Sequence, residues 1–296
     1  MIDLSKDDSI QAIIDFLESE NYIADRSIAT SVFLSQRLNR PLLIEGRSGV
    51  GKTEIGTLLA KLFNTDLIRL QCYEGLDTNT AVYEWNYAKQ LLYIKLEESD
   101  GKSISERKTN VFNRDFLMER PLLSSITNQS KSPILLIDEV DRADEEFEAF
   151  LLELLSEFQV TIPEIGTIKA KYPPIVILTS NRTRELSDAL RRRCLYLWID
   201  YPSFDKELKI IRTKLPDIDE SLSDQIVRFV EKVRTLDLNK TPGISETLDW
   251  VHAIMVMKFN SLDDQTIEHT LNALIKNVDD LKQIKESGFD EIFSNT

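Results

Sequence analysis

The sequence predicts an α/β fold, with a parallel sheet layered between helices and a smaller, all-helical domain after it. Three patterns predict this. The apolar segment Leu42 to Ile44 leads into a glycine-rich turn and then into a segment of helical period. Two more apolar segments, 134–137 and 175–178, end in polar side chains, as buried parallel strands do. The last third of the chain is helical in period. We expect the sheet domain over residues 1–202 and the helical domain over 203–296.

Composition limits the classes of partner. The 296 residues carry a formal net charge of -14, whereas non-specific binding to nucleic acid needs clustered lysine and arginine. Protein partners are therefore favoured over DNA. No apolar run reaches the length of a membrane span, and the acidic N-terminus is not that of an export signal. We expect a cytoplasmic protein without membrane insertion, whose two cysteines, Cys72 and Cys194, are reduced core residues.

The glycine-rich turn matches the phosphate-binding pattern G-x-x-x-x-G-K-[ST]. Its glycines let successive backbone N–H groups converge on phosphate oxygens, next to the positive end of a helix. Lys52 is expected to reach the β- and γ-phosphates, and Thr53 to offer its hydroxyl to Mg²⁺. The sequence thus predicts ATP and Mg²⁺ as ligands. The residues expected to bind the nucleotide are Gly46, Ser48, Gly49, Val50, Gly51, Lys52, Thr53 and Glu54.

Helical spacing also predicts two amphipathic helices before this loop and one that begins at Lys52. Residues 67–70 are expected to form the next strand. Residues 91–94 are β-prone, and 98–110 are polar without an apolar period, which is typical of a surface insert. Further on, we expect a helix over 147–158, with its apolar stripe in the core, and a β-hairpin on either side of Gly166.

Two carboxylates follow the apolar segment that ends at Ile137. The carboxyl end of a buried parallel strand lies at the crevice where open α/β sheets bind ligands. Asp138 is therefore expected in the Mg²⁺ shell, and Glu139 is expected to orient and polarise the attacking water.

A second strand, 175–178, ends in polar residues. There, Asn181 can touch the γ-phosphate and the attacking water, or it can simply form a turn. A short helix then reaches three arginines, 191–193, before the strand 195–199. Arginines at a helix C-terminus can also serve only to complement the helix dipole.

Together these motifs resemble the AAA+ ATPases of the MoxR group over roughly residues 21–202. The resemblance rests on the phosphate loop 46–53, the segment Ile137-Asp138-Glu139-Val140-Asp141-Arg142-Ala143, Asn181 and Arg193-Cys194. The amino-acid sequences of residues 71–77 and 141–148 are similar to those of the CoxD-like branch. Members of that branch are associated with maturation of a molybdenum-containing carbon monoxide dehydrogenase.

The resemblance implies a P-loop NTPase core, a helical lid and a homo-oligomeric ring, usually a hexamer. In such a ring an arginine of the neighbouring subunit completes the ATP site, and Arg193 matches that position best, with Arg192 second. The family's inserts, here the irregular segment near Asp77 and the hairpin around Gly166, engage clients. The partners implied are a metalloenzyme client and an adaptor with a von Willebrand factor A domain.

One position departs from the family pattern. Many relatives carry an arginine early in a lid helix, where this sequence has Thr247. We therefore expect no direct sensing of the γ-phosphate by the lid, and slow turnover. The expected activity is an ATP-hydrolysing chaperone that remodels a partner. Two other hypotheses are a nucleotide-gated binding switch with little turnover and a DNA motor, which the acidic composition disfavours.

Overall fold

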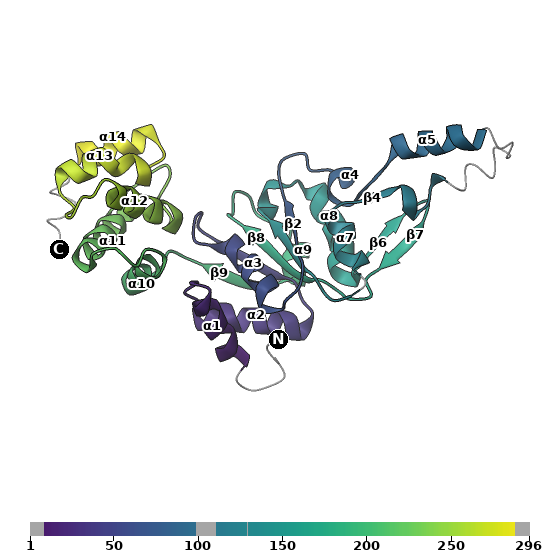
Figure 1. Ribbon diagram of the computed structural model, residues 1–296, viewed down its shortest axis with the longest axis horizontal. Coiled ribbons are helices and arrows are strands. Elements are labelled where there is room, and N and C mark those ends of the chain that lie inside the picture. The colour runs from purple at the N-terminus through teal and green to yellow at the C-terminus, as the bar shows by residue number, and fades with distance from the viewer. Residues whose placement is uncertain (1–8, 99–110, 129, 288–296) are drawn as a thin grey trace. The chain divides into compact units, whose positions relative to one another are not determined.

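The computed structural model describes residues 9–98, 111–128 and 130–287. The chain forms a five-stranded sheet in the order β2-β5-β8-β1-β9 (Figure 1). The registers of β1 with β8, β8 with β5 and β5 with β2 are all parallel. The strands are β1 (Leu42–Gly46), β2 (Leu67–Gln71), β5 (Ile134–Asp138), β8 (Ile175–Ser180) and β9 (Leu195–Ile199). The parallel sheet that the apolar segments predict is confirmed.

Helices cover both faces of this sheet. On one face, inward side chains of α7, α8 and α9, such as Leu123, Leu151 and Leu190, pack against strand residues that include Leu135 and Val176. On the other face α3 lies so close that a Cβ on Gly56 would be 3.0 Å from the side chain of Leu136. The helices of this part are α2 (Arg26–Leu38), α3 (Lys52–Leu62), α7 (Pro121–Thr127), α8 (Glu145–Glu157) and α9 (Asp188–Arg193), with the short η2 (Val140–Arg142) after β5.

Contacts divide the described chain into two units. The first comprises residues 9–10, 27–45 and 53–197, and the second comprises 11–26, 46–52 and 198–287. The second unit contains α1 (Ser9–Ser19) from residue 11 onward and five helices with a core of their own around Phe229 and Trp250. Those five are α10 (Phe204–Lys214), α11 (Glu220–Thr235), α12 (Ile244–Val256), α13 (Asp264–Leu274) and α14 (Val278–Glu286). The helical C-terminal portion is confirmed, and the expected boundary at residue 202 stays a prediction.

The segment between β2 and β5 differs from expectation. Residues 91–94, expected as β-prone, belong to α5 (Tyr87–Glu98). Short elements surround this helix in sequence, namely α4 (Thr78–Ala81), β3 (Tyr83–Trp85), η1 (Arg114–Phe116) and β4 (Leu117–Glu119), and β3 pairs with β4 in a separate antiparallel pair. A strand at 91–94 would need a neighbour, and β4 is already paired with β3. Most of the polar insert, 99–110, lies outside the described residues.

Two other local predictions, the hairpin and the burial of the cysteines, are confirmed. The hairpin around Gly166 is formed by β6 (Gln159–Ile162) and β7 (Gly166–Lys169), which pair antiparallel. Cys72 and Cys194 are free and buried, and burial raises the pKa of each thiol to about 12. Both sulfurs are therefore protonated at physiological pH, which leaves little nucleophilic thiolate. No helix of the described chain is long and apolar enough to cross a membrane.

Asp280 is a buried carboxylate of the helical unit and gives a test of the stability of that unit. The carboxylate accepts hydrogen bonds from the backbone N–H groups of Asn239 and Lys240, at 2.8 and 2.9 Å. Burial alone would raise the pKa of Asp280, but these hydrogen bonds outweigh it and hold the pKa below its ordinary value.

We expect Asp280→Asn to lower the free energy of unfolding by about 2 kcal/mol, because two backbone N–H donors lose a charged acceptor. Because the folded-state pKa is lowered, the contribution of Asp280 is present above the ordinary carboxyl pKa and is lost as the pH falls toward the folded value. Urea unfolding at pH 7 and pH 3 measures both. Exposed Asp237→Asn is the control, and an equal loss in the two variants would contradict this role.

Candidate functional site

The phosphate loop joins β1 to α3. Gly46 ends β1 where the chain passes the backbone of Ile199, and a Cβ there would lie 2.0 Å from the Ile199 oxygen, so only glycine fits. Gly49 and Gly51 have φ of 72° and 88°, in the left-handed region that glycine adopts without strain. Ser48 precedes Gly49, and Val50 lies between the two glycines. The predicted curl of the backbone is therefore present.

The basic residue of the loop is directed at the loop itself. Lys52 is the first residue of α3 and is buried. Its Nζ donates to the carbonyl oxygens of Gly46 and Arg47, at 2.8 and 2.6 Å. Glu54 lies in the first turn of the same helix. The ammonium group is thus enclosed by the backbone that the motif assigns to phosphates.

The second residue of α3 connects the loop to the acidic strand. Thr53 Oγ1 donates to Asp138 Oδ1 at 2.9 Å, and Asp138 is the last residue of β5. The carboxylate is buried. Thr179 Oγ1, from β8, donates to the same oxygen at 2.5 Å. Three elements that are distant in sequence thus meet at one carboxylate.

Glu139 has an unusual backbone conformation. It lies in the left-handed region with φ 54° and ψ 49°, directly after β5, which costs a non-glycine residue about 1–3 kcal/mol. Its N–H donates to Thr179 Oγ1 at 3.0 Å, and its carboxylate accepts from Arg142 at 3.1 Å. The side chain is 32% exposed. The chain turns sharply here, so consecutive carboxylates have different roles: Asp138 is enclosed and Glu139 can reach solvent.

Asp141 ties the end of β8 to this turn. The buried carboxylate accepts from the backbone N–H groups of Asn181 and Thr183, at 3.2 and 2.8 Å, and from the Thr183 hydroxyl at 2.7 Å. Asn181, the polar residue expected after this strand, is therefore held by its backbone beside the acidic turn. Sequence reasoning gave Asp141 no role of its own; its signal was a carboxylate two residues after Glu139.

A hollow of about 640 Å³ lies next to this turn. It is lined by Tyr73, Glu74, Asp141, Arg142, Ala143, Asp144, Glu145, Thr183 and Arg184. Carboxylates outnumber guanidinium groups in this lining, so the hollow favours a cationic group over an anionic one. It lies beyond the carboxyl ends of β2, β5 and β8, where open α/β sheets bind ligands.

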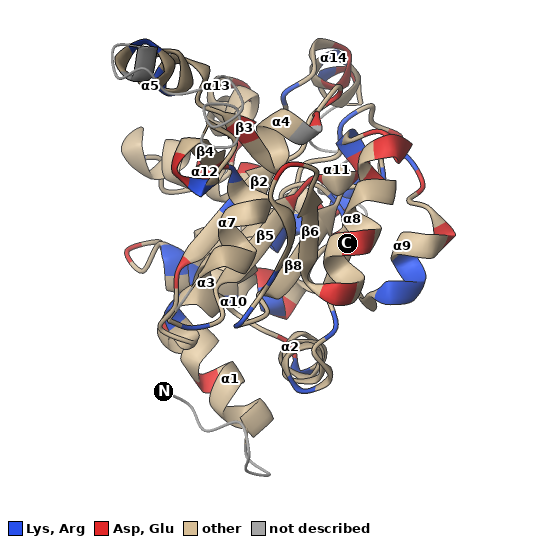
Figure 2. Ribbon diagram, turned by 90° about the vertical axis from the view of Figure 1, so that its right-hand side faces the viewer, with Lys and Arg blue, Asp and Glu red and all other residues tan. Residues whose placement is uncertain are grey.

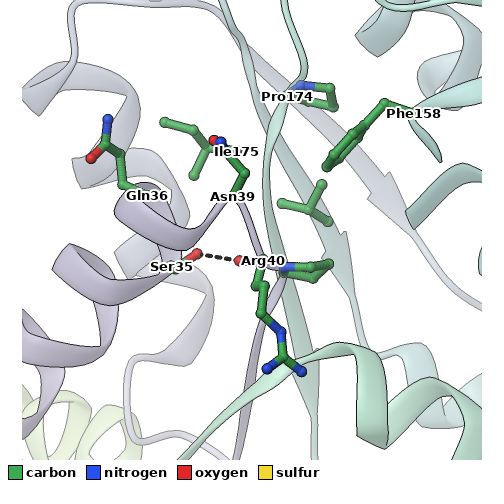
Figure 3. A pocket seen from close by; sticks show the side chains of 9 residues that line it. Ser35, Gln36, Asn39, Arg40, Phe158, Pro174 and Ile175 are labelled. Atoms are coloured by element: carbon green, nitrogen blue, oxygen red, sulfur yellow. Dashed lines mark hydrogen bonds between the residues drawn. The ribbon is translucent and has the colours of Figure 1, made fainter. Parts of the chain in front are cut away.

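The opposite end of the sheet has a much smaller cavity. This cavity, about 10 Å³, lies between the end of α2 and the start of β8 (Figure 3). It is no larger than a single water. Figure 3 shows Arg40 directed away from it, while Ser35 Oγ donates to the Arg40 carbonyl oxygen at 2.7 Å. A ligand-sized space is therefore found at the phosphate-loop end of the sheet and not here.

Arg40 instead supports the helix that carries the predicted arginines. Its guanidinium donates to the carbonyl oxygens of Arg192 and Arg193, at 2.7 and 3.2 Å, and so satisfies groups that end α9. Both arginine side chains are exposed, and together with Arg191 they account for the blue residues of α9 in Figure 2. Arg193 itself donates to Ser156 Oγ of α8 at 2.7 Å. Within one copy, the structure thus directs Arg193 toward α8.

Glu45 is a site residue that sequence reasoning missed. It is 1% exposed on β1, next to the first glycine of the loop. Its carboxylate accepts from Arg191 at 3.1 Å and from Ser180 Oγ at 3.4 Å, and Arg182 lies 4.0 Å away. One buried anion therefore joins β1, the end of β8 and the arginine helix. The signal was a lone charged residue within an apolar strand.

Thr53 and Asp138 could supply part of a metal site. No group of three or more His, Cys, Asp or Glu in the described chain could hold a metal ion. Mg²⁺ is commonly bound by one or two carboxylates, waters and substrate phosphates. A threonine hydroxyl 2.9 Å from a buried carboxylate, at the end of a phosphate loop, fits that kind of site.

The family is decided by a match to the model of the AAA domain (dynein-related subfamily), which covers residues 41–194, more than half of the chain. The chain belongs to this AAA family. Among curated proteins it is similar to uncharacterized proteins of Staphylococcus haemolyticus and Staphylococcus aureus. The first is 26% identical, covering 78% of this chain and 82% of that protein; the second is 26% identical, covering 74% and 76%.

Solved structures agree on the fold. Two variants of RuvB from Thermotoga maritima match with a TM-score of 0.50 each. They are 18% and 16% identical, covering 86% and 90% of this chain and 69% and 76% of the RuvB chains. At this identity the likeness shows the AAA+ P-loop fold alone. AAA+ proteins generally bind ATP and Mg²⁺, and the family suggests ATPase activity.

We expect Glu45→Gln to lower the free energy of unfolding by about 2 kcal/mol, because Arg191 and Arg182 lose their buried counter-charge. This loss is smaller than that for a fully buried pair because both arginines are partly exposed. Chemical denaturation measures it. The control is Glu185→Gln, an exposed carboxylate between β8 and α9, and an equal effect of the two variants would contradict the role of Glu45.

Proposed function

We propose that this chain is an ATPase and acts as a MoxR-type AAA+ chaperone, closest to the CoxD-like branch. The observation that carries the ATPase proposal is the Thr53–Asp138 hydrogen bond, with Glu139 turned away by its left-handed backbone. This arrangement separates a metal-binding acid from an acid that can receive a proton. Phosphoryl transfer to water needs both.

The residues divide the work as follows. The phosphate-loop amides and Lys52 hold the β- and γ-phosphates, and Thr53 and Asp138 hold Mg²⁺. The metal supplies neutralisation of charge on the phosphates. Glu139 orients the attacking water and accepts its proton, and Asn181 contacts the γ-phosphate and the water. For Glu139 to do this, its carboxylate must release Arg142, a partly exposed partner that costs little to displace.

The proposed assembly is a homo-oligomeric ring, likened to the hexamers of the group, in which Arg193 or Arg192 of one copy serves the site of the next. Two observations support it. Both side chains are exposed at the end of α9, and Arg40 and Glu45 fix that helix from within. A correctly placed guanidinium contributes roughly 10³–10⁵ in rate.

The proposed client contact is α5. Four large apolar side chains of this helix, Tyr87, Leu91, Leu92 and Leu96, are more than half exposed. Figure 1 draws α5 away from the five-stranded sheet. Exposed apolar patches mark interaction sites. A metalloenzyme of the molybdenum-containing carbon monoxide dehydrogenase kind, with an adaptor carrying a von Willebrand factor A domain, is the partner set we propose. The cytoplasmic location stays a prediction.

A nucleotide-gated switch is the second candidate. Thr247, where relatives carry an arginine, is buried, and its hydroxyl donates to Glu207 and to the Gly243 carbonyl oxygen. It therefore offers the nucleotide no cation. Slow turnover, with ATP controlling assembly and adaptor docking, follows from that substitution.

The first test measures ATPase activity per molecule against protein concentration. We expect activity to rise with concentration, and Arg193→Ala to lower kcat by at least 10²-fold with nucleotide affinity unchanged, since the arginine acts on developing charge. The same measurement on Arg192→Ala identifies which of the two arginines completes the ATP site of the neighbouring copy. Exposed Arg37→Ala is the control. Concentration-independent activity, or full activity in both arginine variants, would refute the shared site.

A second test distinguishes an ATP-hydrolysing chaperone from a nucleotide-gated switch. Glu139→Gln should bind ATP and lose hydrolysis. If the chain is an ATP-hydrolysing chaperone, this variant also fails to activate the client. If the chain is a nucleotide-gated switch, the variant still docks the adaptor and activates the client. Capture from native cells with tagged Glu139→Gln should recover a molybdenum hydroxylase subunit or its adaptor. Recovery of nucleic-acid machinery, with salt-sensitive DNA binding, would favour a DNA motor instead.

A further inference from the structure

Asp138 has a third partner that the proposed reaction does not use. Its Oδ1 accepts from Thr53 and Thr179, and its Oδ2 accepts from the guanidinium of Arg69 at 2.5 Å. The Asp138 side chain is 3% exposed, whereas that of Arg69 is 51% exposed. One oxygen is thus held by hydroxyl groups from α3 and β8, and the other by a cation that reaches in from solvent.

The strand register brings Arg69 to this position. On β2, Arg69 is paired with Leu136, and Gln71 is paired with Asp138. Residues two apart on a strand, and residues paired between parallel strands, point to the same face of the sheet. Arg69, Gln71 and Asp138 therefore share the face that α3 covers. Gln71 Oε1 accepts from the same Arg69 nitrogen at 2.8 Å, which orients the guanidinium along the strand toward the carboxylate.

The two carboxylate oxygens of Asp138 differ in how available they are to a metal ion. A threonine hydroxyl can keep donating its proton to Asp138 while its lone pairs face a cation. The hydrogen bonds to Oδ1 are therefore compatible with bound Mg²⁺. Oδ2 is the oxygen that would be left for the ion or its waters, and Arg69 donates to it. A guanidinium and a divalent cation carry charge of the same sign and need the same lone pairs.

We propose that Arg69 is a positioning residue that holds Asp138 and competes with Mg²⁺ for it, and so sets the Mg²⁺ concentration that tight nucleotide binding requires. This rests on the nucleotide site proposed above. The exposure of Arg69 fits a replaceable partner, because an ion pair with one half-exposed member is cheap to break. While the metal is absent, Arg69 neutralises a buried anion that would otherwise be costly.

The test measures binding of a non-hydrolysable ATP analogue to the full chain at increasing free Mg²⁺. We expect Arg69→Gln to lower the half-saturating Mg²⁺ concentration by about three- to tenfold, the range for loss of one partly exposed charged hydrogen bond. Gln71→Ala leaves the net charge unchanged but frees the guanidinium, and should lower it by about twofold. Arg120→Gln removes the same charge from an ion pair with Glu84 in another part of the same unit and should change nothing.

An unchanged or higher Mg²⁺ requirement in both Arg69→Gln and Gln71→Ala would overturn the proposal, as would an equal shift in Arg120→Gln, which would show a general effect of charge. Thermal unfolding of each variant identifies a loss of structure, and Gln71→Ala still decides the question if Arg69→Gln does not fold. If the unmodified protein binds the analogue with no dependence on Mg²⁺, the proposed function fails first, and the role of Arg69 falls with it.

Discussion

The carboxylate of Asp138 is the point on which the rest of the site depends. It is buried at the end of β5 and accepts hydrogen bonds from α3, β8 and β2. A buried anion is stable only when its lone pairs are satisfied. The requirement to satisfy Asp138 therefore fixes the start of α3, which continues the phosphate loop, relative to the two central strands. The same interaction that stabilises the anion places Thr53 for a metal.

The turn after Asp138 converts this anchor into a site with two different acids. Because Glu139 takes a left-handed conformation, the chain leaves the sheet at once, and Asp141 is buried against the end of β8. There it binds the N–H groups of Asn181 and Thr183. The strain at Glu139 is thus offset by hydrogen bonds on both sides of it. Backbone strain retained in this way is common where a side chain must be held for function.

The sequence predicted local periods and motifs well, because those depend on neighbours in the chain. The loop 46–53, the apolar strands and the helical stripes all follow from spacing of 2 or 3.6 residues. The segment 91–94 was misjudged because β-branched and aromatic residues favour strands only where a partner strand exists. Here α5 exposes Leu91 and Leu92 instead. Propensity alone could not reveal the missing partner.

Side-chain partners that are distant in the sequence could not be predicted either. Arg69 and Glu45 interrupt apolar strands, which signals that each has a partner, but only the three-dimensional structure shows that these are Asp138 and Arg191. Pairing across β2 and β5, or across β1 and α9, depends on the topology of the whole sheet. The roles of Asn181 and Arg193 stay predictions, since each depends on a nucleotide or on a second copy of the chain.

The arginines of one copy show why a second copy matters to the proposed chemistry. Near the acidic turn, Arg69 is paired with Asp138 and Arg142 with Glu139. In the helical unit, Arg234 is held by Glu207 in a buried pair, beside the Thr247 hydroxyl. Each of these guanidinium groups is already neutralised by a carboxylate of its own unit. A cation that acts on charge developing at a phosphate is better supplied by a side chain that does not have to leave a buried carboxylate, and Arg192 and Arg193, exposed at the end of α9, are arginines of this kind.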